Sequence, residues 1–216
     1  MPKNSLYFSF NKLWAAALLF ISSCTFLFVL PVMNNMPVWV FRLCMSAVLL
    51  FSILSLEKVK LYFVLVGFIA AILDWFSDMG QYSAIGPLLK TVTFVFVFLV
   101  VGSLMIKFLK QKEVGLYSLL EAINGYLLLG ILFSSITVML FTLSPESYQS
   151  SHGNIVRNDL FYYAMITLTT TGYGDVLPVT AAAKNLAMII AVCGQIYVAF
   201  LVGVLVGKYT NKLTHE

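Results

Sequence analysis

Six long apolar runs follow one another along this sequence, and they constrain its fold more than any other feature. In the hydrocarbon of a bilayer every backbone polar group must be paired within its own element, and about 20 residues of helix are needed to cross. The runs lack the alternation of β-barrel strands, so we expect helices. The sequence therefore predicts an all-α membrane protein with six transmembrane helices, over residues 13–30, 38–56, 59–75, 84–106, 116–143 and 181–207.

The composition agrees with this interpretation and excludes other classes of protein. Apolar residues make up 61% of the 216 residues and charged residues 10%, whereas ordinary soluble domains have about 25% charged residues. A soluble enzyme is therefore excluded. The net charge of +4 is too small to indicate a groove for nucleic acid, so the expected surroundings of the chain are membrane lipid.

The basic residues fall on alternate sides of the apolar runs. Nine of the 13 Lys and Arg residues precede the first run, follow the last run, or lie in or directly beside the second-to-third and fourth-to-fifth connections. The connections 31–37 and 76–83 contain no basic residue. Because Lys and Arg near span ends stay on the cytoplasmic side, both termini are predicted to be cytoplasmic, which requires an even number of crossings.

The connection between the fifth and sixth runs, residues 144–180, contains a further apolar stretch that is too short to cross a bilayer. Asn158 and Asp159 have the character of a helix N-cap, and residues 160–169 then predict a re-entrant half-helix. The carboxyl end of such a helix carries partial negative charge from the helix dipole. A cation is therefore favoured at that end.

Directly after this predicted half-helix comes the segment Thr-Thr-Thr-Gly-Tyr-Gly-Asp, residues 169–175. Non-helical backbone at membrane depth is tolerated where it is buried in protein or lines a water-filled path. Gly172 and Gly174 alternate with bulkier residues and permit positive φ, so successive carbonyls can turn toward one side. Such a row of carbonyls is a ligand set for a dehydrated alkali cation. An external turn is the alternative, but a turn would not need an apolar half-helix before it.

This segment resembles the selectivity filter of the potassium channel superfamily, in particular six-transmembrane bacterial-type channels with a single pore loop and no charged voltage sensor. The matching filter positions are Thr170, Thr171, Gly172, Tyr173 and Gly174, with Thr169 before them and Asp175 after them. The resemblance implies that the carbonyls of residues 170–173 and the Thr170 hydroxyl replace the water around K⁺ ions. It also implies that no organic cofactor is required and that the protein lies in a plasma membrane, the inner membrane of a bacterium.

Residues next to the filter are given supporting roles by the same resemblance. Tyr162 and Tyr163 match the paired aromatic positions of the pore helix, and we expect one of them to donate a hydrogen bond to Asp175. These tyrosines and Asp175 would form a cuff around the filter. Thr169, directly before the filter, is expected to support it as well.

Assembly and gating also follow from the resemblance. The family surrounds its ions with four filter segments, whereas this chain contains one, so a homotetramer is expected. Gly194 aligns with the hinge glycine of the family. Val198, Val202 and Val206 follow on one face of the last run and are expected to form a gate that closes by dewetting; packing of this stripe against the fifth run is the alternative.

The predicted domain organisation has five parts. Residues 1–12 are a cytoplasmic N-terminus, 13–106 a peripheral four-helix domain, 107–115 a cytoplasmic linker, 116–209 the pore domain and 210–216 a short cytoplasmic tail.

The peripheral domain resembles a voltage sensor in number of helices alone. A voltage sensor needs several basic residues at intervals along its fourth helix, but residues 84–106 contain Lys90 alone, so we expect weak voltage dependence. Glu121 and Asn124 lie where a link between the outer helices and the gate is expected. The tail is too short for a regulatory domain, which leaves a stimulus in the membrane, an unidentified regulatory partner, or constitutive opening.

The function predicted from these features is passive, potassium-selective conduction. A weakly selective monovalent cation channel is the alternative, because Thr171 stands where valine is commonest in the family. A potassium transporter with the same architecture would carry four filter segments in one chain. A membrane enzyme lacks support, because the sequence shows no paired carboxylates, metal triad or nucleophile with a base.

Overall fold

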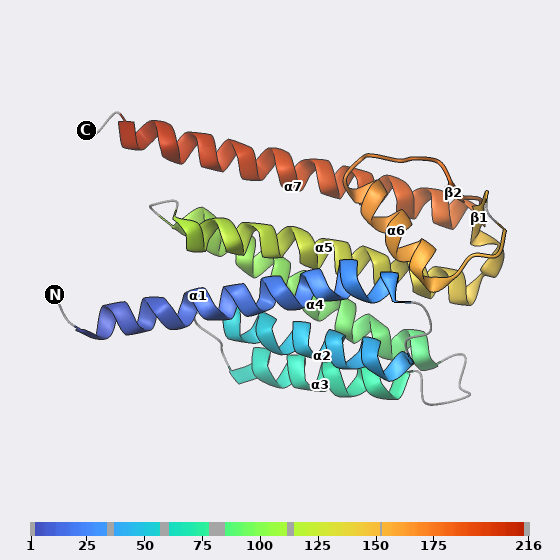
Figure 1. Ribbon diagram of the computed structural model, residues 1–216, viewed down its shortest axis with the longest axis horizontal. Coiled ribbons are helices and arrows are strands. Elements are labelled where there is room, and N and C mark those ends of the chain that lie inside the picture. Colours follow the sequence, from blue (N-terminus) through green and yellow to red (C-terminus); the bar gives the residue numbers. More distant parts are fainter. Residues whose placement is uncertain are drawn as a thin grey trace. The chain divides into compact units, whose positions relative to one another are not determined.

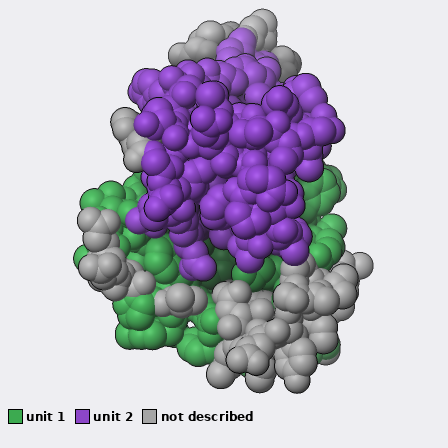
Figure 2. Space-filling model, turned by 90° about the vertical axis from the view of Figure 1, so that its right-hand side faces the viewer, with its two compact units in different colours: residues 1–128 green, residues 129–216 purple. Residues whose placement is uncertain are grey.

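The computed structural model describes residues 3–33, 37–56, 61–77, 85–111, 115–151 and 153–213. The chain divides into two compact units, Met1–Leu128 and Leu129–Glu216, which Figure 2 shows in green and purple. Residues 112–114 of the predicted linker and 214–216 of the predicted tail lie outside the described residues. Each unit is described by itself.

The first unit is helical throughout its described part. Its helices are α1 (Lys3–Cys24), which continues as a π-helical turn (Thr25–Val29) and a 3₁₀ turn (Leu30–Val32), then α2 (Val38–Ser55), α3 (Leu61–Ser77), α4 (Ile85–Lys110) and the first part of α5. Neighbours in sequence pack side by side, α1 on α2, α2 on α3 and α3 on α4 (Figure 1). Leu19, Leu49 and Phe96 are fully buried between them.

Across both units, several helices are long and apolar enough to cross a membrane, which confirms the predicted all-α membrane protein. Within the described residues they are Leu13–Val32, Leu89–Lys110, Leu116–Leu143 and Ala181–Lys208, and the helix at Trp39–Ser55 is shorter. The predicted N-terminal segment 1–12 is helical from Lys3 onward, as the start of α1. The total of six crossings stays a prediction.

The first part of helix α5 (Leu116–Leu143) belongs to the first unit, with helices α1 to α4. Its Asn124 is buried and donates a hydrogen bond of 2.8 Å from Nδ2 to the carbonyl of Ala16 in α1. Glu121, also fully buried, forms an ion pair with Lys107 of α4. These contacts lie within the first compact unit, which extends to Leu128. The domain division at the linker 107–115 stays a prediction.

The second unit holds the remainder of α5, a 3₁₀ turn (Pro145–Ser147), strand β1 (Tyr148–Ser150), helix α6 (Arg157–Leu168), strand β2 (Val176–Pro178) and helix α7 (Ala181–Leu213). Helix α5 ends shortly before Pro145, because a proline disfavours the helical conformation in the residue that precedes it. The strands pair antiparallel, with Gln149 opposite Leu177. Helices α6 and α7 pack on each other beside this small sheet (Figure 1).

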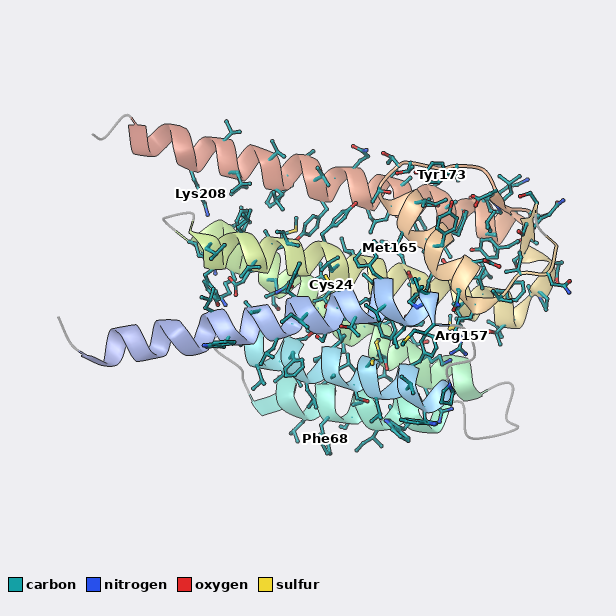
Figure 3. The ribbon with its side chains drawn as sticks, in the orientation of Figure 1. Cys24, Phe68, Arg157, Met165, Tyr173 and Lys208 are labelled. Carbon is teal, nitrogen blue, oxygen red and sulfur yellow. The ribbon has the colours of Figure 1, made fainter. Side chains whose placement is uncertain are left out.

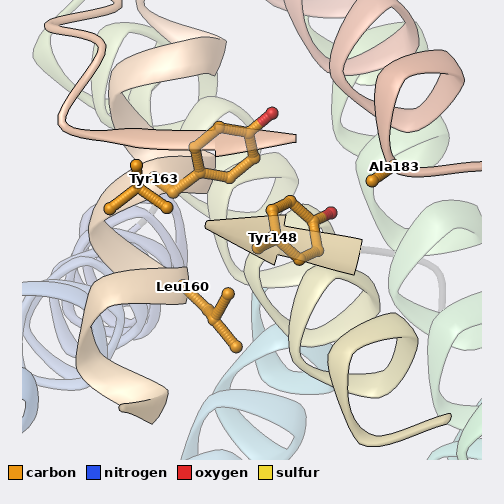
Figure 4. Close-up of a cluster of buried hydrophobic side chains, with 5 residues drawn as sticks. Tyr148, Leu160, Tyr163 and Ala183 are labelled. Atoms are coloured by element: carbon orange, nitrogen blue, oxygen red, sulfur yellow. The ribbon is translucent and has the colours of Figure 1, made fainter. Parts of the chain in front are cut away.

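The core of the second unit holds the two ends of the loop between α6 and β2. It consists of Tyr148 from β1, Leu160 and Tyr163 from α6, Val176 from β2 and Ala183 from α7. The rings of Tyr148 and Tyr163 meet edge to face with their centroids 5.1 Å apart (Figure 4). One apolar cluster thus fixes the helix before the loop, the strand after it and the helix that follows.

The start of α6 differs from the prediction at Asn158 and Asp159. The helix begins at Arg157, with Val156 as its N-cap residue. Asp159 lies in the first turn, where its Oδ2 accepts a hydrogen bond of 2.9 Å from the backbone N–H of Val156. The carboxylate therefore caps the helix from inside the first turn, and α6 ends at Leu168, one residue earlier than predicted.

Candidate functional site

The loop that follows α6 begins at a tightly bonded helix end. The Thr169 hydroxyl donates to the carbonyls of Met165 and Ile166, at 3.0 and 3.3 Å. The N–H groups of Thr171 and Gly172 both donate to the carbonyl of Ile166, at 2.8 and 3.2 Å. Two successive N–H groups thus point at one oxygen, which fixes the first residues of the loop against the end of α6.

The backbone of the loop alternates in a regular way. Thr170, Gly172 and Gly174 have positive φ values of 59°, 51° and 80°. Between them, Thr171 and Tyr173 do not, and among the described residues Thr170 is the only non-glycine with positive φ. Alternation between left-handed and right-handed conformations points successive N–H groups one way and therefore the carbonyls the other way.

The carbonyls of residues 170–173 accept no hydrogen bond within the described part of the chain. Their residues are exposed, and the Tyr173 side chain is 72% exposed. Figure 3 labels Tyr173 in the loop beside α6 and α7. Carbonyls that accept no hydrogen bond from the protein are available to bind a cation.

The sequence did not predict that Thr170 has a positive φ, because a threonine gives no indication of this backbone conformation. A β-branched residue there is a genuine outlier and costs free energy. Such a conformation persists where the surrounding structure holds it. Its hydroxyl accepts a hydrogen bond of 3.0 Å from Nε2 of Gln195 in α7.

The outer end of the loop is held at Asp175 from two sides. The Tyr162 pKa is raised by partial burial, by a hydrogen bond to the Asp175 carboxylate and by the negative charge of Asp175. The Tyr162 ring also lies parallel to that of Tyr173, with centroids 6.4 Å apart. On the backbone side, Ser151 donates to the Asp175 carbonyl from its N–H at 2.9 Å and its hydroxyl at 3.2 Å.

Of the two tyrosines predicted to contact Asp175, the structure brings Tyr162 to it. Tyr163 is buried and packs against Tyr148 in the core, and burial raises the pKa of both; for Tyr148 the pKa rises to about 12. Ser151 has no distinguishing sequence signal, since it is one serine of several in a polar loop. Its partner is 24 residues away along the chain.

Helix α7 approaches the base of the loop at Gly194. A Cβ at this position would stand 2.0 Å from the Leu168 carbonyl oxygen, so glycine is needed for the contact. The helix runs without interruption through Gly194, from Ala181 to Leu213. Val198, Val202 and Val206 lie further along α7 and are 45%, 50% and 59% exposed.

Comparison with known proteins agrees with this geometry. Residues 126–211 match the ion channel family. The chain is 33% identical over 94 residues to potassium voltage-gated channel subfamily A member 5 of Mus musculus, covering 40% of this chain and 15% of the relative. It is 32% identical over 113 residues to the voltage-gated potassium channel regulatory subunit KCNF1 of Rattus norvegicus, covering 48% and 23%. It is 36% identical over 86 residues to potassium voltage-gated channel subfamily A member 10 of Mus musculus, covering 40% and 16%.

The chain therefore spans less than a quarter of the length of these relatives. No solved structure gives a significant match. The matched family and the matched relatives are ion channels and potassium channel subunits, not enzymes. Over the matched segment, the chain is similar to the potassium channel superfamily.

Proposed function

We propose that this chain forms a potassium-selective channel in which residues 170–174 are the selectivity filter. The observation that carries the proposal is the alternating backbone, with positive φ at Thr170, Gly172 and Gly174. The K⁺ ligands are the carbonyls of Thr170, Thr171, Gly172 and Tyr173, together with the Thr170 hydroxyl. These oxygens replace the water that a K⁺ ion loses on entry, so no organic cofactor takes part.

A homotetramer completes the filter. One chain supplies a single column of carbonyls, and an ion needs ligands on all sides. The filter residues are exposed, as are apolar side chains of α7 such as Ile189 and Ile196. This exposure supports an assembly in which further copies and membrane lipid cover these side chains. We place the tetramer in a bacterial inner membrane with both termini in the cytoplasm, in keeping with the distribution of Lys and Arg.

The filter is supported at both ends by its neighbours. Thr169 caps the carbonyls at the end of α6, and its hydroxyl lies 3.0 Å from that of Thr171. Tyr162 holds the Asp175 carboxylate at the other end. Tyr163 supports the filter indirectly, through the apolar core.

The gate of the proposed channel lies on α7. Val198, Val202 and Val206 form an exposed stripe below the filter, and four such stripes would make an apolar constriction. Gly194 is the hinge position in this proposal. A valine stripe packed against α5 would be buried, whereas these side chains are about half exposed.

Voltage is a weak stimulus for this channel. Helix α4 carries Lys90 near its start and Lys107 and Lys110 in its last turn, without a series of basic residues between them. Lys107 is paired with buried Glu121 and is not free to move alone. Each charge that crosses the membrane potential contributes about 2.3 kcal/mol per 100 mV, so these few charges cannot make channel opening steeply dependent on voltage. A regulatory partner is a further source of control for this channel. Two relatives are themselves named regulatory subunits of potassium channels, which supports this proposal.

Reversal potentials in mixed K⁺ and Na⁺ test the proposal. The purified protein in liposomes should carry a current that reverses near the K⁺ equilibrium potential, with little dependence of conductance on voltage. Equal permeability to Na⁺ would favour the second candidate, a weakly selective cation channel, for which Thr171 is the motivating residue. Absence of any cation current at all tested voltages would reject both.

A further inference from the structure

Gln195 is a polar side chain in an otherwise apolar stretch of α7, next to Gly194. Its Nε2 lies 3.0 Å from the Thr170 hydroxyl oxygen, and the two residues are 25 positions apart. An amide in an apolar helix at membrane depth usually hydrogen-bonds a neighbouring element. Here that neighbour is the first residue of the proposed filter.

The contact constrains what the Thr170 hydroxyl can do. A threonine hydroxyl has two acceptor lone pairs and one proton to donate. The Gln195 amide takes one lone pair, which leaves the other for a cation and directs the proton away from both. Because the threonine side chain is β-branched and stiff at χ1, one such bond fixes its orientation.

The backbone around Gln195 keeps the amide in place. Gly194 lies so close to the Leu168 carbonyl that no Cβ fits between them. Helix α7 is therefore in contact with the end of α6 immediately before the side chain that reaches Thr170. The strained φ of 59° at Thr170 requires such support from its surroundings.

We infer that Gln195 is a positioning residue for the innermost cation site of the filter, holding the Thr170 hydroxyl so that its free lone pair faces the ion. This inference rests on the proposed function. It goes beyond that function because it makes ion binding at the inner end of the filter depend on a side chain of α7. A shift of α7 at Gln195 then changes cation affinity without any change in the filter sequence.

The test measures K⁺ binding through stability, so it does not depend on flux. A ligand that binds the folded state raises the unfolding temperature by an amount that grows with the logarithm of its concentration divided by its Kd. Thermal unfolding of the purified full-length protein is followed over a series of K⁺ concentrations, with Na⁺ keeping the ionic strength constant. The variants are Gln195→Leu, which removes the amide at similar size, and Asn185→Leu, which makes the same kind of change elsewhere on α7.

The expected result is a loss of apparent K⁺ affinity of roughly 3- to 10-fold in Gln195→Leu, the value of one hydrogen bond, with Asn185→Leu unchanged. A merely structural role would lower the unfolding temperature equally in K⁺ and in Na⁺. In a Thr170→Val background, Gln195→Leu should have no further effect on K⁺ affinity, since the hydroxyl is already gone. If Gln195→Leu does not assemble, Gln195→Asn carries the same prediction, because its amide is one methylene too short.

Two other outcomes separate the inference from the proposed function. Wild-type K⁺ affinity in Gln195→Leu, or an effect that persists undiminished in Thr170→Val, would overturn the role of Gln195 and leave the filter intact. A wild-type protein stabilised equally by K⁺ and Na⁺ would instead overturn the filter itself, and the role of Gln195 with it.

Discussion

Gly194 in α7 lies against the backbone carbonyl of Leu168 at the end of α6, so closely that a Cβ at position 194 would stand 2.0 Å from the oxygen. The Leu168 backbone carbon and its Cδ1 would be 3.0 and 3.1 Å away. The obstacle is therefore mainly backbone and cannot rotate aside. This contact joins α7 to the residue two positions before Thr170.

Replacement of Gly194 by alanine should destabilise the protein by about 1–3 kcal/mol, the usual cost of forcing a methyl group into a packed site. Thermal unfolding of the purified variant measures this effect. Gly203→Ala is the matched control, because a Cβ at position 203 meets no described atom within 4 Å. Equal stability of the two variants would show that the close approach at Gly194 is not maintained.

Gly174 tests the backbone of the filter separately from packing. Its φ is +80°, and a Cβ there meets nothing within 4 Å, so alanine introduces backbone strain alone. Left-handed conformation costs an alanine about 1–2 kcal/mol. Gly174→Ala should therefore lower the selectivity for K⁺ over Na⁺ in liposome flux, whereas Gly115→Ala, at an ordinary φ, should not. Unchanged selectivity in both variants would argue against the alternating backbone.

Tyr162 and Tyr163 form a matched pair of adjacent side chains with different surroundings. Tyr162→Phe removes the hydroxyl that interacts with the Asp175 carboxylate and should speed the loss of current during sustained opening, as measured in single channels or macroscopic currents. Tyr163→Phe serves as the control at the same helix, since its ring lies in the apolar core. If the two variants inactivate at the wild-type rate, Tyr162 does not hold the filter.

The same bond predicts a dependence on pH. The pKa of Tyr162 is raised from its ordinary value of 10.0, first by partial burial and then by Asp175. The contribution of a group with a raised pKa is complete below the ordinary value and is lost as the pH rises through the raised value. Inactivation should therefore be insensitive to pH from neutral up to about 10 and accelerate above it, and Tyr162→Phe should abolish this acceleration.

The ion pair of Lys107 and Glu121 links the end of α4 to α5. Lys107 also donates to the Ser55 carbonyl at 3.1 Å, and Gln111 donates to the other oxygen of Glu121 at 2.9 Å. Breaking a buried pair leaves one uncompensated charge and costs about 3–5 kcal/mol. Thermal unfolding of Lys107→Met should show this loss, while Lys110→Met, which alters an exposed lysine of the same turn, should change little.

A second part of the experiment exchanges the two charges, so that residues 107 and 121 again carry opposite charges. The exchange Lys107→Glu with Glu121→Lys should recover part of the stability that either single reversal loses. Additive losses in the double variant would indicate that the two charges do not interact.

Local sequence patterns predicted the parts of this site that depend on neighbouring residues. The apolar runs gave the helices, and the Gly172 and Gly174 pattern located the alternating loop. The start of α6 was misplaced because Asp159 caps equally well from the first turn, through the N–H of Val156. The sequence alone does not distinguish these two positions of a capping carboxylate.

Contacts between distant segments could not be read from the sequence in the same way. Ser151 bonds Asp175 through the pairing of β1 with β2, and the three-residue strands carry no periodic signal. Gln195 meets Thr170 because Gly194 lets α7 approach α6 closely. Both side chains are identified by the folded arrangement, since each depends on where another element ends.

In the proposed channel, four copies of residues 170–173 surround a single file of K⁺ ions. Anomalous scattering from Rb⁺ or Tl⁺ in crystals of the tetramer tests it most directly, because both ions replace K⁺ and can be located without ambiguity. We expect a row of peaks on a fourfold axis, level with the carbonyls of Thr170, Thr171, Gly172 and Tyr173. Peaks away from these oxygens, or an assembly that is not fourfold, would contradict it.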